Sequence, residues 1–156
     1  MQSSIYVETS IVSYLTARPS RDLVRAAHQE VTCEWWTGRE TYELFISQLV
    51  LDEASAGDPG AAALRLLALR DLPLLELTPE AVALAQQLVR RAALPPKAAG
   101  DALHIALTAV HGVDYLLTWN CTHIANATMR PKIEAICRGA GFEPPVICTP
   151  LELVEE

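Results

Sequence analysis

The sequence predicts an α/β protein built around a central, mainly parallel sheet of four to five strands. Short apolar runs of strand length alternate with longer segments of helix length along the whole chain. This alternation favours a parallel sheet whose strands are joined by right-handed helical crossovers. The pattern is clearest in the stretch 100–120, where an apolar helix, a tight turn and a buried strand follow one another.

The stretch 100–120 organises the rest of the chain. Gly100 and Asp101 stand where its helix is expected to begin, and Gly112 stands where it should end. Between them, apolar residues recur at spacings of three and four: Leu103, Ala106, Leu107 and Val110. The run 115–118 is typical of a strand covered on both faces, and polar Asn120 follows it. Because such ends converge on one crevice in a parallel sheet, Asp101 and Asn120 should lie near each other.

The remaining elements follow from the same patterns. Before the stretch we expect strands at 5–7, 42–46 and 74–77, and helices at 11–15, 22–39, 48–56, 61–69 and 79–93. After it we expect a helix at 128–139, a strand at 146–148 and a terminal turn at 151–154 before an acidic tail. Thr9 and Ser10 are expected to cap the first helix, and Pro79 occupies the first position of its helix.

Bulk properties favour one domain over residues 1–156. The chain is 51% hydrophobic, and a chain of this length buries roughly 70% of its unfolded surface. We expect no signal peptide, and no apolar run reaches the ~20 residues of a membrane span. The four cysteines form no C-x-x-C pair, which argues against a zinc ribbon. Because no secretory signal is expected, reduced thiols in the cytoplasm are the better interpretation. A transition-metal site at Cys121 and His123 has no second close pair to support it.

The net charge of −7 argues against a surface coated with phosphate-binding cations. It does not exclude a nuclease, since carboxylates clustered around a divalent ion contribute negative charge themselves. Any grip on RNA must then come from local basic groups, which are Arg18, Arg21 and Arg25 early in the chain and Arg90, Arg91 and Lys97 before Asp101. The alternative interpretation of each is a solvated helix face.

Four oxygen-bearing side chains should converge under the predicted topology. Glu8 ends the first strand, Glu53 lies on the helix after the second, Asp101 opens the central helix and Asn120 follows the fourth strand. Three carboxylates and a carboxamide suit a hard divalent cation such as Mg²⁺ or Mn²⁺. Such an ion can activate water and stabilise the charge of a phosphodiester under attack.

Each of these residues has a structural alternative. Asp101 can act only as an N-cap, Glu53 can be a solvated helix residue, and Asn120 can simply end its strand. Glu8 is harder to dismiss, because an acid directly after so apolar a strand lies close to buried structure and needs partners.

Several neighbouring residues are candidates for supporting roles. Ser10 and Thr118 would hold the carboxylates in place, although capping and strand packing explain them as well. His104 ranks low, because a lone helical histidine is more often packed or hydrogen-bonded than functional. His123 and Asn126 follow Asn120 in a loop that would help to shape the site, whereas Asp114 begins its strand at the opposite end.

The chain resembles the PIN-domain nucleases, whose best-known members are the VapC-type toxins of bacterial toxin–antitoxin systems. The resemblance rests on the Ile5-Tyr6-Val7-Glu8-Thr9-Ser10 start, on a D-A-x-x-x-A context at Asp101 and on an L-x-T-x-[DN] context at Asn120. It implies a three-layer α/β/α PIN-like fold and a Mg²⁺/Mn²⁺-dependent endoribonuclease. It also favours Glu53 over the adjacent Asp52 as the second acid.

Two departures from that family pattern bear on activity. The first acid is Glu8 rather than the usual Asp, and the fourth position is the neutral Asn120 rather than Asp. The missing charge should weaken a second ion most. A catalytically degenerate RNA- or protein-binding module is therefore the alternative, and an unrelated doubly wound enzyme with a small ligand is a third.

Assembly is a further expectation. The resemblance implies a homodimer neutralised by a small antitoxin protein. The leucines between the second and fourth strands exceed what one helix face needs and would supply the dimer surface: Leu64, Leu66, Leu67, Leu69, Leu72 and Leu74.

Overall fold

A five-stranded parallel sheet forms the centre of the protein, as the sequence predicted. The computed structural model describes residues 2–91 and 93–153. The strands are β1 (Ser4–Val7), β2 (Glu43–Ser47), β3 (Leu74–Leu75), β4 (Tyr115–Leu117) and β5 (Val146–Cys148). They are ordered β3-β2-β1-β4-β5, and each neighbouring pair is parallel.

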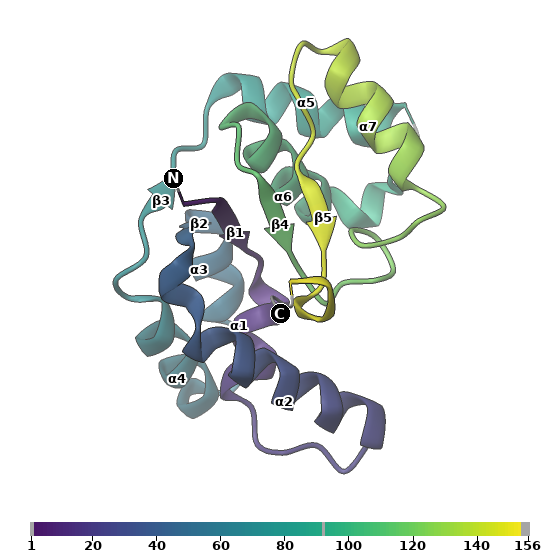
Figure 1. Ribbon diagram of the computed structural model, residues 1–156. Coiled ribbons are helices and arrows are strands. Elements are labelled where there is room, and N and C mark those ends of the chain that lie inside the picture. Colours follow the sequence, from purple (N-terminus) through teal and green to yellow (C-terminus); the bar gives the residue numbers. More distant parts are fainter. Residues whose placement is uncertain (1, 92, 154–156) are drawn as a thin grey trace.

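Seven helices cover this sheet in two layers, which gives a three-layer α/β/α fold. They are α1 (Thr9–Thr16), α2 (Leu23–Thr37), α3 (Gln48–Ala54), α4 (Pro59–Leu69), α5 (Pro79–Arg90), α6 (Ala99–Val110) and α7 (Arg130–Gly139). Helix α1 contacts α2, α3 and α4, whereas α5 packs on α6 and α7. Figure 1 shows the same two groups, with α1, α2 and α4 in the lower part of the view and α5 and α7 at the top.

Side-chain caps explain where several helices begin. Asp22, Ser47, Asp58 and Thr78 each accept a hydrogen bond from a backbone N–H in the first turn of the helix that follows. Pro59 and Pro79 occupy first-turn positions, where a missing N–H costs nothing. The helices after the strands are therefore started by local chemistry that is visible in the sequence.

The structure corrects several predicted boundaries. The N-cap of α1 is Glu8, not Thr9 or Ser10. Helix α6 begins at Ala99, directly after a 3₁₀ turn (Pro96–Ala98), so Asp101 is its third residue and does not cap it. Helix α7 begins at Arg130 rather than at 128, and β3 ends at Leu75 rather than at 77. The last predicted turn is a 3₁₀ turn (Pro150–Glu152), while Val154 and the acidic tail lie outside the described residues.

The register between β1 and β4 places the functional end of the sheet. Val7 pairs with Leu117, and the Glu8 N–H donates to the Leu117 carbonyl at 3.1 Å. The chain leaves β1 toward the layer of α1 and leaves β4 toward the layer of α7, so a topological switch point lies between these two strands. In open α/β sheets such a point is where ligands bind. Glu8 and Thr118 lie side by side there.

The two central strands are deeply buried. Ile5, Tyr6 and Val7 of β1 and Leu116 and Leu117 of β4 have no exposed surface. Just beyond β4, the buried Trp119 donates from its indole Nε1–H to the Thr32 hydroxyl of α2 at 2.7 Å. This bond connects the end of the central strand to the helix layer that contains α1 and α2. In the described part of the chain, no helix has the length and apolar character required to cross a membrane.

Replacing Thr32 by valine should destabilise the protein by about 1–3 kcal/mol, because it leaves the buried Trp119 N–H without an acceptor. Thr37→Val on the same helix is the matched control, since Thr37 is exposed and its hydroxyl bonds only to the Glu34 carbonyl. Urea unfolding followed by tryptophan fluorescence measures both. Equal losses in the two variants would contradict the role of the Trp119–Thr32 bond.

Candidate metal centre

Glu8 is a buried carboxylate held by hydroxyl groups. Its side chain caps α1 by accepting a hydrogen bond from the Ser10 N–H at 3.1 Å. The residue is only 5% exposed. Its Oε1 also accepts from the Thr118 hydroxyl at 2.6 Å and from the Ser10 hydroxyl. Both residues considered from the sequence as supporting groups thus contact this carboxylate. These donors compensate for the loss of water and fix the direction of the side chain.

Glu53 reaches the same region from α3, which is capped at its start by Ser47. Its Oε1 accepts from the Thr9 hydroxyl at 2.5 Å and from His104 Nε2 at 2.7 Å. Partial burial acts to raise the pKa of Glu53, but the hydrogen bond and charge of His104 and the Thr9 hydroxyl outweigh it. The pKa of this carboxyl therefore lies below its usual value.

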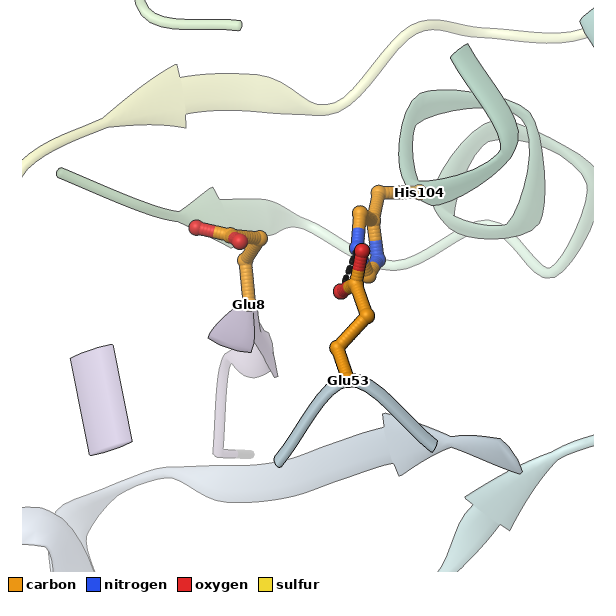
Figure 2. A group of neighbouring side chains, drawn as sticks. All are labelled: Glu8, Glu53 and His104. Atoms are coloured by element: carbon orange, nitrogen blue, oxygen red, sulfur yellow. Dashed lines mark hydrogen bonds and ion pairs between the residues drawn. The ribbon is translucent and has the colours of Figure 1, made fainter. Parts of the chain in front are cut away.

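His104 completes the group from α6. It is fully buried, and its Nδ1 lies 2.7 Å from the Tyr6 hydroxyl. One oxygen from each glutamate and one nitrogen of His104 lie within 4.8 Å of one another. Figure 2 shows Glu53 and His104 facing each other, with the Glu8 carboxylate beside them. Three elements that are far apart in sequence thus place potential metal ligands at the switch point.

Asp101 and Asn120 form a second, adjacent group. Asp101 Oδ2 lies 3.1 Å from His123 Nδ1, and Asn120 Oδ1 accepts from the His123 backbone N–H at 3.0 Å. Asp101 does not belong to the group of Glu8, Glu53 and His104 among the described residues. The groups are linked by Thr118, whose hydroxyl donates to Glu8 and accepts from the Asn120 N–H at 2.9 Å.

The other polar residues considered from sequence lie elsewhere. Asp52 accepts from the Gln48 side chain on the surface of α3. Asp114 bonds to the backbone and hydroxyl of Ser4, at the opposite end of β1. Asn126 bonds within its own loop, to the Thr122 carbonyl and to Thr128. Among the described residues, Cys121 belongs to no group of potential metal ligands.

The sequence predicts a strand at Tyr6 and a helix cap at Ser47, but it indicates no contact between these residues and His104. The expectation that His104 is a packed, hydrogen-bonded histidine was right, but its partner is one of the candidate acids. The available signal was its position three residues after Asp101, which places it one turn along the same helix. Nothing local to Tyr6 indicates that its hydroxyl would meet a residue 98 positions away.

The residues present fit a hard divalent cation. Both glutamates offer carboxylate oxygens, the ligands that Mg²⁺ and Mn²⁺ favour. Glu53 Oε1 already has two donors, while its Oε2 faces Gly100, where a Cβ atom would lie 3.6 Å away. A side chain at position 100 would contact this second oxygen, and glycine leaves that side of the oxygen free. Two close carboxylates also repel each other, and a cation would relieve that repulsion.

Acid should remove a stabilising contribution that depends on the Glu53 charge. The folded-state pKa of Glu53 is lowered, so its ionised form stabilises the fold above the unfolded pKa of about 4.3. That contribution is lost as the pH falls through the folded-state pKa. In EDTA, the stability difference between wild type and Glu53→Gln should therefore shrink as the pH is lowered from about 5 to about 3. Urea unfolding across that range measures it, and a constant difference would contradict the lowered pKa.

Comparison with known proteins agrees with this geometry. A family model described as the PIN domain matches residues 5–120, from β1 to the residue at the end of the switch-point crevice. No curated protein matches the chain. The matched range covers most of the chain and contains Glu8, Glu53, Asp101 and Asn120. The chain therefore belongs to the PIN domain family, whose members are generally Mg²⁺-dependent nucleases.

Proposed function

We propose that this protein is a Mg²⁺- or Mn²⁺-dependent endoribonuclease and the toxin of a type II toxin–antitoxin pair of the VapC type. The observation that carries the proposal is the meeting of the Glu8 and Glu53 carboxylates at the switch point of a PIN-domain sheet. Asp101 and Asn120 lie on the helix and loop that border the same point, linked to Glu8 through Thr118. In this proposal Glu8, Glu53 and Asp101 hold the metal, and Asn120 assists.

Each of these residues has a distinct task. Glu8 is fixed by hydrogen bonds from Ser10 and Thr118, and Glu53 is held at one oxygen by Thr9 and His104. His123 orients Asp101, and the carbonyl of Asn120 holds the backbone of that histidine in place. A bound divalent ion supplies an activated water and stabilises charge on the phosphodiester. The protein residues keep the acids in position before substrate arrives.

Basic residues near the site offer a grip on RNA phosphates. Arg25 on α2 lies over the Tyr14 ring at 4.9 Å, and Tyr14 in turn stacks on Trp119, the residue before Asn120. In the part of the chain that the structure describes, no carboxylate pairs with the six basic residues singled out in the sequence analysis. These cations are thus available to an external anion in a protein whose net charge is −7.

The alternative function is a degenerate PIN module that binds RNA or protein without cleavage. One observation favours it: the Asn120 side-chain oxygen is neutral and already accepts the His123 N–H. Such a module would bind RNA equally well with metal and with EDTA. The ribonuclease requires metal for product formation, so one incubation separates the two.

We expect purified protein to cleave single-stranded RNA with Mn²⁺ or Mg²⁺ and to leave it intact in EDTA. Glu8→Gln and Asp101→Asn should each lower the rate by about a hundredfold or more, since each removes a charge from the metal site. Asp114→Asn is the control, because Asp114 lies at the opposite end of the sheet beside Ser4. Product formation on a labelled RNA ladder measures the rates. Undiminished cleavage by both site variants would show that another site performs the reaction.

Exposed leucines, as well as membership of the PIN domain family, support the proposed protein partners. Leu64 and Leu67 of α4 and Leu74 of β3 are each half exposed or more, whereas Leu69 is buried. The exposed leucines of α4 suit a second copy of the chain, and a small antitoxin protein would neutralise the dimer. All four cysteines are free, which suits the cytoplasm, where an RNA-cleaving toxin would act.

Light scattering should report twice the chain mass of 17.0 kDa at micromolar concentration. Leu67→Glu places a charge in the proposed interface and should give the monomer mass. Leu23→Glu is the matched control, because Leu23 is 85% exposed but lies on α2. A monomeric wild type, or equal dissociation in both variants, would rule out this surface.

A further inference from the structure

Behind Glu53, a chain of buried hydrogen bonds crosses the core of the protein. The Ser47 hydroxyl lies 2.7 Å from the Tyr6 hydroxyl, which lies 2.7 Å from His104 Nδ1. His104 Nε2 then lies 2.7 Å from Glu53 Oε1. Ser47 is 2% exposed, and Tyr6 and His104 are not exposed at all. The chain thus joins the end of β2, the middle of β1 and helix α6 to one carboxylate at the surface of the site.

Donor and acceptor chemistry gives this chain one direction when the imidazole is neutral. A carboxylate can only accept, so His104 donates its Nε2–H to Glu53. Nδ1 then has no proton and must accept from the Tyr6 O–H. Having given its only proton to His104, the Tyr6 oxygen accepts from the Ser47 O–H. Because Ser47, Tyr6 and His104 are buried and bond to one another, every proton between them has one defined position.

These hydrogen-bonded side chains lie in a part of the core that apolar residues could have filled. Ile5, Val7 and Ile105, the sequence neighbours of Tyr6 and His104, are fully buried and apolar. The parallel pairing of β1 with β2 and β4 uses backbone groups and needs no side-chain hydroxyl. We therefore expect the effect of these buried polar groups at Glu53, where the row of hydrogen bonds reaches the site.

At the site, these hydrogen bonds occupy one oxygen of Glu53. Oε1 accepts from His104 and from Thr9, whereas Oε2 faces the bare backbone of Gly100. A glutamate side chain loses considerable rotamer freedom when it is held in one geometry. Holding it through Oε1 beforehand means that a cation arriving at Oε2 does not have to order it. Support of this kind behind a ligand is worth about 10–100-fold in metal affinity.

We propose that His104 is a positioning residue, oriented by Tyr6 and Ser47, that holds Glu53 by one oxygen and presents the other to the divalent cation. This inference rests on the proposed metal site. It also assigns His104 a role other than ligand, although His104 lies within reach of both glutamates. Both imidazole nitrogens are already engaged, with Tyr6 and with Glu53.

The first test is Mn²⁺ affinity, measured by isothermal calorimetry on the full chain. Tyr6→Phe removes the hydroxyl that orients His104 and should weaken binding about tenfold. His104→Gln keeps an N–H near the position of Nε2 and should retain most of the affinity, while His104→Leu should lose about tenfold or more. Thr108→Val is the control, because Thr108 is equally buried on α6 but bonds only to helix carbonyls.

The outcomes separate the positioning role from the metal site itself. If wild type binds Mn²⁺ and a folded Tyr6→Phe binds it equally well, the positioning role is wrong and the metal site stands. A His104→Gln variant as weak as His104→Leu would also overturn it. If wild type binds no Mn²⁺, the metal site fails and the positioning role fails with it.

A second measurement reads the tautomer of His104 in the wild-type protein. Nitrogen-15 spectra of the imidazole rings report which nitrogen carries the proton, and the His104→Gln spectrum, or failing that the Tyr6→Phe spectrum, assigns the signal. At a pH where the imidazole is neutral, we expect a single Nε2–H tautomer for His104 that persists when the wild-type protein is saturated with Mg²⁺. Loss of that N–H on adding Mg²⁺ would identify His104 as a ligand and overturn the proposal.

Discussion

The parallel pairing of β1 with β4 is the constraint on which the rest of this site depends. Its register sets Val7 beside Leu117 and therefore Glu8 beside Thr118. Both strands are buried on both faces, so a slip of one residue would turn apolar side chains away from the layers they fill. The position of the first acid is thus maintained by the packing of the whole sheet rather than by the site.

An acidic protein can hold a cluster of carboxylates only by giving each one partners. Here every candidate acid has a different kind of support: hydroxyls for Glu8, a hydroxyl and an imidazole for Glu53, and an imidazole for Asp101. In each case at least one supporting group reaches the acid from another element. The cost of bringing negative charges together is thereby spread over the helix layers on both sides of the sheet.

The four residues singled out from the sequence do not form one ring around a point. Glu8 and Glu53 meet with His104, while Asp101 and Asn120 meet through His123, and Thr118 connects the pairs. The division arises because α6 begins at Ala99, which makes Asp101 a first-turn residue beside the loop after β4. The side chain at position 120 contacts His123, which contacts Asp101. The missing charge of an asparagine instead of an aspartate there acts on these two residues more directly than on Glu8.

The sequence by itself determined the order of strands and helices, the parallel sheet and the place of Glu8 and Asn120 after β1 and β4. These features follow from hydrophobic period, capping residues and glycine or proline breaks, which are all local. Only the tertiary structure decided that Tyr6 meets His104, that Asp101 meets His123 and that Glu8 caps α1. Such contacts depend on strand register, helix rotation and side-chain rotamers, and none of these leaves a periodic signal in the residues concerned.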